Sequence, residues 1–173
     1  MKIFYNSKHL NRLNYNWFLV FLSLFIITTG CKQRTHSPHE KRQEHFKSTL
    51  ELVKPGFKWD GIKAVVVVPG VGCEGCISSV ENFLVAEYQK DNSIKFVLTS
   101  IASTKLLKTK LHLDLDNPNI ILDHENQFSN QIFDSIYPTI FFLDGKGKVN
   151  HVEQVSLTED GLVTLQKQII ANE

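Results

Sequence analysis

Residues 61–76 read GIKAVVVVPGVGCEGC, and this stretch decides the expected fold. The run 64–68 is continuously apolar and mostly β-branched, which is typical of a central strand covered on both faces. Pro69-Gly70 ends the run, because this dipeptide is a strong turn signal. Cys73 and Cys76 follow directly. The sequence therefore predicts a CxxC pair at the end of a buried strand.

A helix is predicted over residues 74–88, because apolar residues recur at i, i+3 and i+7 from Ile77. Cys73 would then lie at the helix N-terminus, where unpaired backbone N–H groups and the helix dipole favour a thiolate. A thiolate is the reactive form of cysteine. Cys76 lies one turn further on, within reach of a mixed disulfide formed at Cys73. The spacing predicts Cys73 as the nucleophile and Cys76 as the resolving cysteine.

The remainder of the chain alternates strands with helices. Strands are predicted over residues 93–101, 119–123, 139–143 and 148–155, and helices over 103–112, 125–133 and from 157–160 to about 170. Residues 144–147 read DGKG, which is a hairpin turn signal. This order predicts an α/β fold with a mixed central sheet flanked by helices, parallel at first and antiparallel at one edge.

The N-terminal thirty residues have the features of an export signal. A basic segment ends at Arg12, and the apolar run 17–27 is too short to span a bilayer comfortably. The small residues before Cys31 resemble the lipobox of bacterial lipoproteins, although Thr28 stands where that family usually has Leu. The resemblance implies cleavage before Cys31 and a lipid on its thiol. An uncleaved N-terminal anchor is the alternative, and both place the remaining chain outside the cytoplasm.

The other boundaries follow from composition. Residues 1–30 are predicted to be the signal peptide, 31–50 the lipidated cysteine and a flexible polar tether, and 51–173 the folded domain. The segment 51–173 contains eleven Lys, no Arg and sixteen Asp or Glu, which argues against a nucleic-acid partner.

Of the three cysteines in the chain, Cys31 is isolated in the sequence, whereas Cys73 and Cys76 are three positions apart. If Cys31 carries lipid, Cys73 and Cys76 remain as a pair in an oxidising compartment, where cysteines normally form disulfides. A disulfide between residues three apart closes a very small loop and stabilises little. This pair is therefore better explained by chemistry than by structural cross-linking.

A second stretch of sequence, far from the CxxC along the chain, also bears on the fold. Residues 136–149 read IYPTIFFLDGKGKV, and together with the CxxC they resemble the thioredoxin superfamily over roughly residues 58–172. Residues 119–133 look like the insertion of its membrane-tethered TlpA-like and peroxiredoxin-related branch. The resemblance implies a thioredoxin-like fold and a thiol–disulfide oxidoreductase that needs no dissociable cofactor.

The resemblance also implies roles for single residues and for partners. The Tyr137–Pro138 bond would be cis and would face the CxxC, and the Tyr137 backbone would pair with an extended substrate. Gly72 and Glu74 would complete the substrate groove. Substrates would be thiols or disulfides of exported proteins, with electrons from a membrane thiol–disulfide donor. The domain would be lipid-anchored in the bacterial cell envelope and would face the periplasm.

Four positions depart from the family's pattern. Gly72 stands where Trp is usual, Glu74-Gly75 where Pro is frequent, and Val67 where a buried carboxylate is typical. The missing carboxylate removes the usual proton acceptor of the resolving thiol. A carboxylate beside Cys73 also opposes thiolate formation. A more reducing or slower pair is therefore expected.

Two other functions remain open. Residues 70–81, GVGCEGCISSVE, resemble the GMxCxxCxxxVE loop of heavy-metal-associated domains, in which two thiolates carry Cu(I). Cys73 and Cys76 would then be metal ligands, although such domains do not explain the Tyr-Pro-Thr segment at 137–139. The third hypothesis is a thioredoxin-like scaffold with a permanently oxidised CxxC that only binds a partner.

Overall fold

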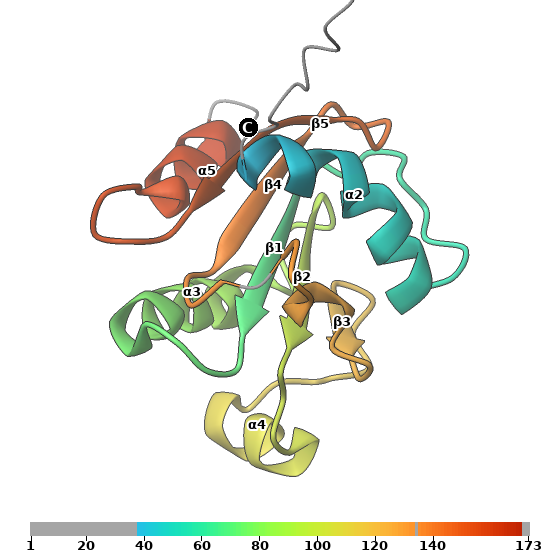
Figure 1. The fold of residues 1–173 in the computed structure, drawn as a ribbon. Coiled ribbons are helices and arrows are strands. Elements are labelled where there is room, and N and C mark those ends of the chain that lie inside the picture. Colours follow the sequence, from blue (N-terminus) through green and yellow to red (C-terminus); the bar gives the residue numbers. More distant parts are fainter. Residues whose placement is uncertain (1–37, 134, 171–173) are drawn as a thin grey trace, which may run out of the picture. The chain divides into compact units, whose positions relative to one another are not determined.

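The computed structural model describes residues 38–133 and 135–170 (Figure 1). The predicted signal peptide, the lipidation of Cys31 and the first part of the tether lie outside these residues. Within them, no helix has the length and apolar character needed to cross a membrane.

In the part of the chain that the structure describes, five strands form one mixed sheet in the order β3-β2-β1-β4-β5. The strands are β1 (Ala64–Pro69), β2 (Ile94–Thr99), β3 (Ile120–Asp123), β4 (Thr139–Leu143) and β5 (Val149–Gln154). β1, β2 and β3 run parallel to one another, β4 is antiparallel to β1, and β5 is antiparallel to β4. The predicted α/β fold and its mixed sheet are therefore confirmed.

Four α-helices flank this sheet among the described residues (Figure 1). They are α2 (Pro38–Val53), α3 (Glu74–Glu87), α4 (Thr104–Leu111) and α5 (Gly161–Ile170). The helix predicted over residues 125–133 is wrong, because only the short 3₁₀ turn Gln127–Ser129 forms there. The buried carboxylate of Asp123 accepts hydrogen bonds from the N–H groups of Gln127 and Phe128 at 2.9 and 2.8 Å. Such local bonds compete with an α-helix.

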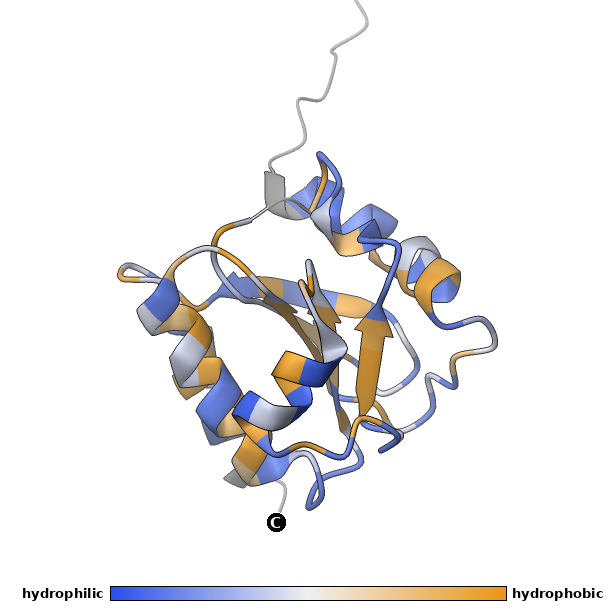
Figure 2. Ribbon diagram, turned by 90° about the horizontal axis from the view of Figure 1, so that it is seen from below, coloured by the Kyte–Doolittle hydropathy of each residue, from blue (hydrophilic) through white to orange (hydrophobic). Residues whose placement is uncertain are grey.

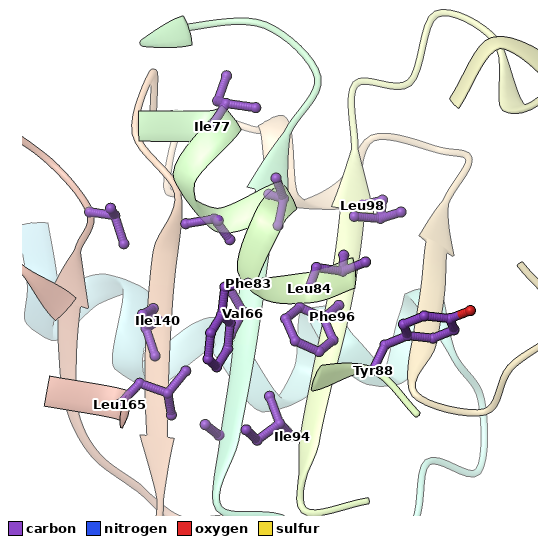
Figure 3. Close-up of a cluster of buried hydrophobic side chains, with 14 of the residues drawn as sticks. Val66, Ile77, Phe83, Leu84, Tyr88, Ile94, Phe96, Leu98, Ile140 and Leu165 are labelled. Carbon is purple, nitrogen blue, oxygen red and sulfur yellow. The ribbon is translucent and has the colours of Figure 1, made fainter. Parts of the chain in front are cut away.

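The central position of β1 gives the domain two apolar cores. All six residues of β1 are buried. Val66 faces one core with Leu84 of α3 and Leu165 of α5 (Figure 3). Val65 faces the opposite core, which α2 covers. Apolar and polar residues are interleaved along the flanking helices (Figure 2), as expected of helices that cover a sheet with one face.

The flexible tether predicted over residues 31–50 is wrong from Pro38 onward. This segment forms α2, and it buries Phe46 and Leu50 completely against the sheet. The Phe46 ring stacks on Phe141 of β4 with a centroid distance of 4.1 Å. These two apolar side chains, four positions apart, attach the helix to the sheet, whereas polar or charged residues fill most of its other positions. The folded domain therefore begins before residue 51.

Candidate active site

The two cysteines lie at the junction predicted for them. Cys73 is the N-cap residue of α3, with φ −67° and ψ 98°, and the helix begins at Glu74. The Ile77 N–H donates to the Cys73 carbonyl oxygen at 2.9 Å, which is the first bond of the helical ladder. The preceding N–H groups of the first turn have no partner within the helix. A thiolate on Cys73 would lie at the positive end of this helix, where anions are favoured.

Cys73 and Cys76 are joined by a disulfide, with their Cα atoms 5.3 Å apart. This Cα separation is ordinary for a disulfide. Cys73 is half-buried, whereas Cys76 is only 9% exposed and belongs to the core beneath α3. An incoming thiol or disulfide therefore has better access to Cys73 than to Cys76.

A distant segment lies against the CxxC. The Cys73 N–H donates to the carbonyl oxygen of Ile136 at 2.8 Å. Gly72 has φ +147°, and a Cβ atom there would overlap that same carbonyl group. Only glycine tolerates this backbone conformation without strain. The close approach explains why residue 72 of this chain is a glycine and not a residue with a large side chain.

The cis bond expected between Tyr137 and Pro138 is wrong, because the described residues contain no cis peptide bond. The trans form is the lower in energy by about 0.5–1 kcal/mol before any tertiary contact acts. The trans segment is held by its own hydrogen bonds. The Tyr137 N–H donates to the Ser135 hydroxyl at 3.0 Å, and the Val155 N–H donates to the Pro138 carbonyl at 2.9 Å. The Tyr137 N–H thus already has a partner within the chain.

A groove of about 440 Å³ lies beside the disulfide. Besides the two cysteines, its lining includes Ser79 of α3 and, from the β5–α5 connection and α5, Leu157 and Val163. Leu157 is 96% exposed, and Val163 is also classed among the exposed apolar residues. Neither residue was singled out in the sequence. Leu157 is a single leucine in a loop and gives no periodic signal, and Val163 is one of several apolar residues in a predicted helix.

Two more exposed apolar side chains stand near the disulfide. Val71 is two residues before Cys73, and Ile136 accepts the Cys73 hydrogen bond. We call Val71, Ile136, Leu157 and Val163 the apolar rim. They are four of the seven large apolar residues that the described part of the chain exposes. More than half of the exposed large apolar residues in the described part of the chain thus belong to segments around the disulfide.

The four residues expected to shape a substrate groove have different surroundings. Gly72 and Glu74 flank the disulfide and are exposed. Pro138 is buried, and Tyr137 is half-buried and lines a small hollow on the other face of the sheet. None of the four lines the groove beside the disulfide.

Val67 lines this small hollow, and the thioredoxin superfamily, which the sequence resembles, typically has a carboxylate at the corresponding position. Its volume is about 10 Å³, which is at most the space of one water molecule. The hydroxyl-bearing residues around Val67 are Thr99, Ser129, Ser135, Tyr137 and Thr139. No Asp or Glu is among the residues that line it. Hydroxyl groups do not replace a carboxylate as proton acceptor near neutral pH.

A metal would have to depend on the cysteines. Across residues 38–133 and 135–170, no group of three or more His, Cys, Asp or Glu side chains is arranged to hold a metal ion. His151 instead stacks on Phe142, with ring centroids 4.2 Å apart. His112 ends α4 in a left-handed conformation. The reduced sulfurs of Cys73 and Cys76 thus remain the two donors that a soft metal would use.

Comparison of the chain with protein-family models, with curated proteins and with solved structures finds no match. The function of the site is therefore argued from the chain's own residues.

The two glycines beside the cysteines provide a matched test of this geometry. Gly72→Ala is expected to destabilise the fold by about 1–3 kcal/mol, because it combines an unfavourable φ with overlap at Ile136. Gly75→Ala meets no atom within 4 Å and lies in α3, so it is expected to be neutral or to stabilise by up to about 1 kcal/mol. Urea unfolding of both variants measures the difference, and equal stabilities would contradict the close contact.

Proposed function

We propose that this chain is a thiol–disulfide oxidoreductase with a thioredoxin-like domain, and that its substrates are exported proteins. One observation carries the proposal: the disulfide joins a half-exposed cysteine at the N-cap of α3 to a buried cysteine one turn along. The accessible sulfur is the one that the helix N-terminus would activate. The buried sulfur is protected from solution and is held next to the first.

The proposed reaction uses the reduced pair. The Cys73 thiolate attacks a substrate disulfide, forms a mixed disulfide and releases one substrate thiolate. The Cys76 sulfur then attacks the Cys73 sulfur, its proton passes to solvent, and the second substrate thiolate leaves. Two electrons have moved from the cysteine pair to the substrate, and the Cys73–Cys76 disulfide is restored. A membrane dithiol donor would reduce it again.

The apolar rim supports a protein rather than a small thiol as substrate. A small disulfide would need only the half-exposed sulfur of Cys73. A polypeptide that docks across the groove would cover Leu157 and Val163, and each aliphatic side chain removed from water contributes to binding. The hollow beside Val67 contains no Asp or Glu, but it lies on the other face of the sheet, whereas Asp160 lines the groove beside both cysteines.

The formed Cys73–Cys76 disulfide also fits a second candidate, a binding scaffold whose disulfide is never reduced. It would use the apolar rim without turnover. The soft-metal alternative needs the reduced cysteines. The experiment below distinguishes it from the oxidoreductase and from the scaffold.

Cysteine variants of the full chain test the proposal through reduction of insulin disulfides in the presence of dithiothreitol. Cys73→Ser is expected to reduce the rate to the uncatalysed background, because it removes the nucleophile. Cys76→Ser is expected to accumulate a mixed disulfide with its target, visible by non-reducing electrophoresis and mass spectrometry.

The other outcomes of this experiment identify the alternatives. Wild-type chain that is inert, with a disulfide that resists dithiothreitol, would support the scaffold. One equivalent of copper on the reduced wild-type chain, lost in both variants and accompanied by no turnover, would support the metal carrier.

Leu157→Ser tests the role of the apolar rim. The variant is expected to raise KM for insulin about tenfold, because it removes an aliphatic contact worth about 1.5 kcal/mol or more. The rate with a small aromatic disulfide should stay unchanged. Leu52→Ser is the matched control, since Leu52 is also an exposed leucine but lies on α2. If both variants behave alike, the rim does not bind substrate.

The cellular location is part of the proposal and depends on residues 1–31. We place the domain in the periplasm, on a lipid attached to Cys31. Radiolabelled palmitate fed to expressing bacteria should appear on the wild-type chain and not on Cys31→Ala. No label on either chain would favour an uncleaved N-terminal anchor, and equal labelling would show that the lipid is not on Cys31.

A further inference from the structure

A second hollow, also of about 440 Å³, lies between α3 and α4 beyond the ends of β1 and β2. We call it the α4 pocket. Its lining is mainly aliphatic: Val68, Leu98, Ile101, Leu106, Leu107 and Leu111. Neither cysteine of the disulfide is among its lining residues. Its volume is within the range of pockets that hold one small organic ligand.

One ion pair interrupts this apolar lining. Glu81 of α3 is only 8% exposed, and its two carboxylate oxygens accept hydrogen bonds from Lys110 of α4 at 2.6 and 2.8 Å. The Lys110 side chain is 60% exposed, so its ammonium group lies at the opening of the pocket, in contact with solvent. An ammonium group has three N–H donors, and two suffice for Glu81. The third is available to an anionic group that enters the pocket.

The surroundings of the pocket favour an anion as well. α4 carries Lys105, Lys108 and Lys110 and no Asp or Glu, and all three lysines are exposed. Glu81 and Lys110 balance each other in the pocket lining, whereas Lys105 and Lys108 add two positive charges on α4 itself. Asp114 and Asp116 lie beyond its C-terminal end, so the helix face beside the pocket favours negative ligands. Leu106 on the same helix is 69% exposed although it lines the pocket. The pocket thus presents an aliphatic wall, a partly uncovered leucine and a positive edge together.

We propose that the α4 pocket binds a fatty acid, with a single acyl chain among the aliphatic side chains and its carboxylate on the free donor of Lys110. The acyl chain would cover Leu106 and remove further apolar surface from water. Glu81 would keep its Lys110 partner, and the neighbouring lysines would offset the added negative charge. This site is independent of the proposed redox function, because it uses neither Cys73 nor Cys76.

Calorimetric titration of the full chain with dodecanoate, below its micelle concentration, tests the proposal. One saturable site is expected, and dodecyltrimethylammonium should bind at least tenfold more weakly because its head group is repelled by α4. Equal affinity for the two amphiphiles would overturn the proposal. So would binding to anionic vesicles in the absence of any binding of monomeric dodecanoate.

Two leucines with equal exposure locate the site. Leu106→Glu is expected to weaken dodecanoate binding at least tenfold, because it places a carboxylate at the pocket. Leu52→Glu, also at a leucine that is 69% exposed, should bind as the wild type does. Equal weakening, or none, would show that dodecanoate binds elsewhere on the chain and would overturn the proposal. Circular dichroism confirms that both variants fold.

The redox proposal and the fatty-acid proposal fail separately. A Cys73→Ser/Cys76→Ser double variant is expected to bind dodecanoate with unchanged affinity. A loss of binding in this variant would overturn the independence of the α4 pocket. Turnover of insulin disulfides by a Leu106→Glu chain at the wild-type rate would support it.

Discussion

The hydrogen bond from the Cys73 N–H to the Ile136 carbonyl joins two loops that are far apart in the sequence. The sheet makes this bond possible, because β1 and β4 are antiparallel neighbours with Val67 opposite Thr139. The end of β1 and the start of β4 therefore meet at one edge of the sheet. Gly72 allows the two backbones to approach closely, and the rest of the site is arranged around this contact.

Residues at the end of β1 and directly after it line both the α4 pocket and the groove beside the disulfide. Pro69 and Gly70 line the α4 pocket, and three residues later Cys73 lines the groove beside the disulfide. Gly70 packs so closely on the backbone of Ser100 that a Cβ atom would overlap its carbonyl oxygen. The loop between β1 and α3 is thus fixed on both sides by backbone contacts.

Local sequence patterns predicted the elements that carry the cysteines. The apolar run of β1 and the periodicity of α3 are strong signals, and they correctly place Cys73 at a helix N-terminus. The helix predicted from residue 103 also forms as α4, where Ser103 is the N-cap and its hydroxyl accepts the Leu106 N–H at 3.3 Å. These features depend on neighbours in sequence, which is why the sequence alone is sufficient for them.

Features that depend on distant contacts could not be read in the same way. Phe46 and Leu50 attach α2 to the core that also contains Phe141 of β4. The sequence of α2 alone does not show this packing. The apolar rim combines residues from separate segments, and the exposure of Leu157 is decided by the path of a loop. The cis bond at Pro138 was inferred from family resemblance rather than from any local pattern, and it was wrong.

The two residues between the cysteines are exposed, and a side chain at Gly75 would meet open space. Neither Glu74 nor Gly75 contributes to a core. Charge in the first turn of a helix alters the balance between thiolate and disulfide at the N-cap. Substitutions at Glu74 and Gly75 can therefore change the reduction potential of the cysteine pair without any repacking of the domain.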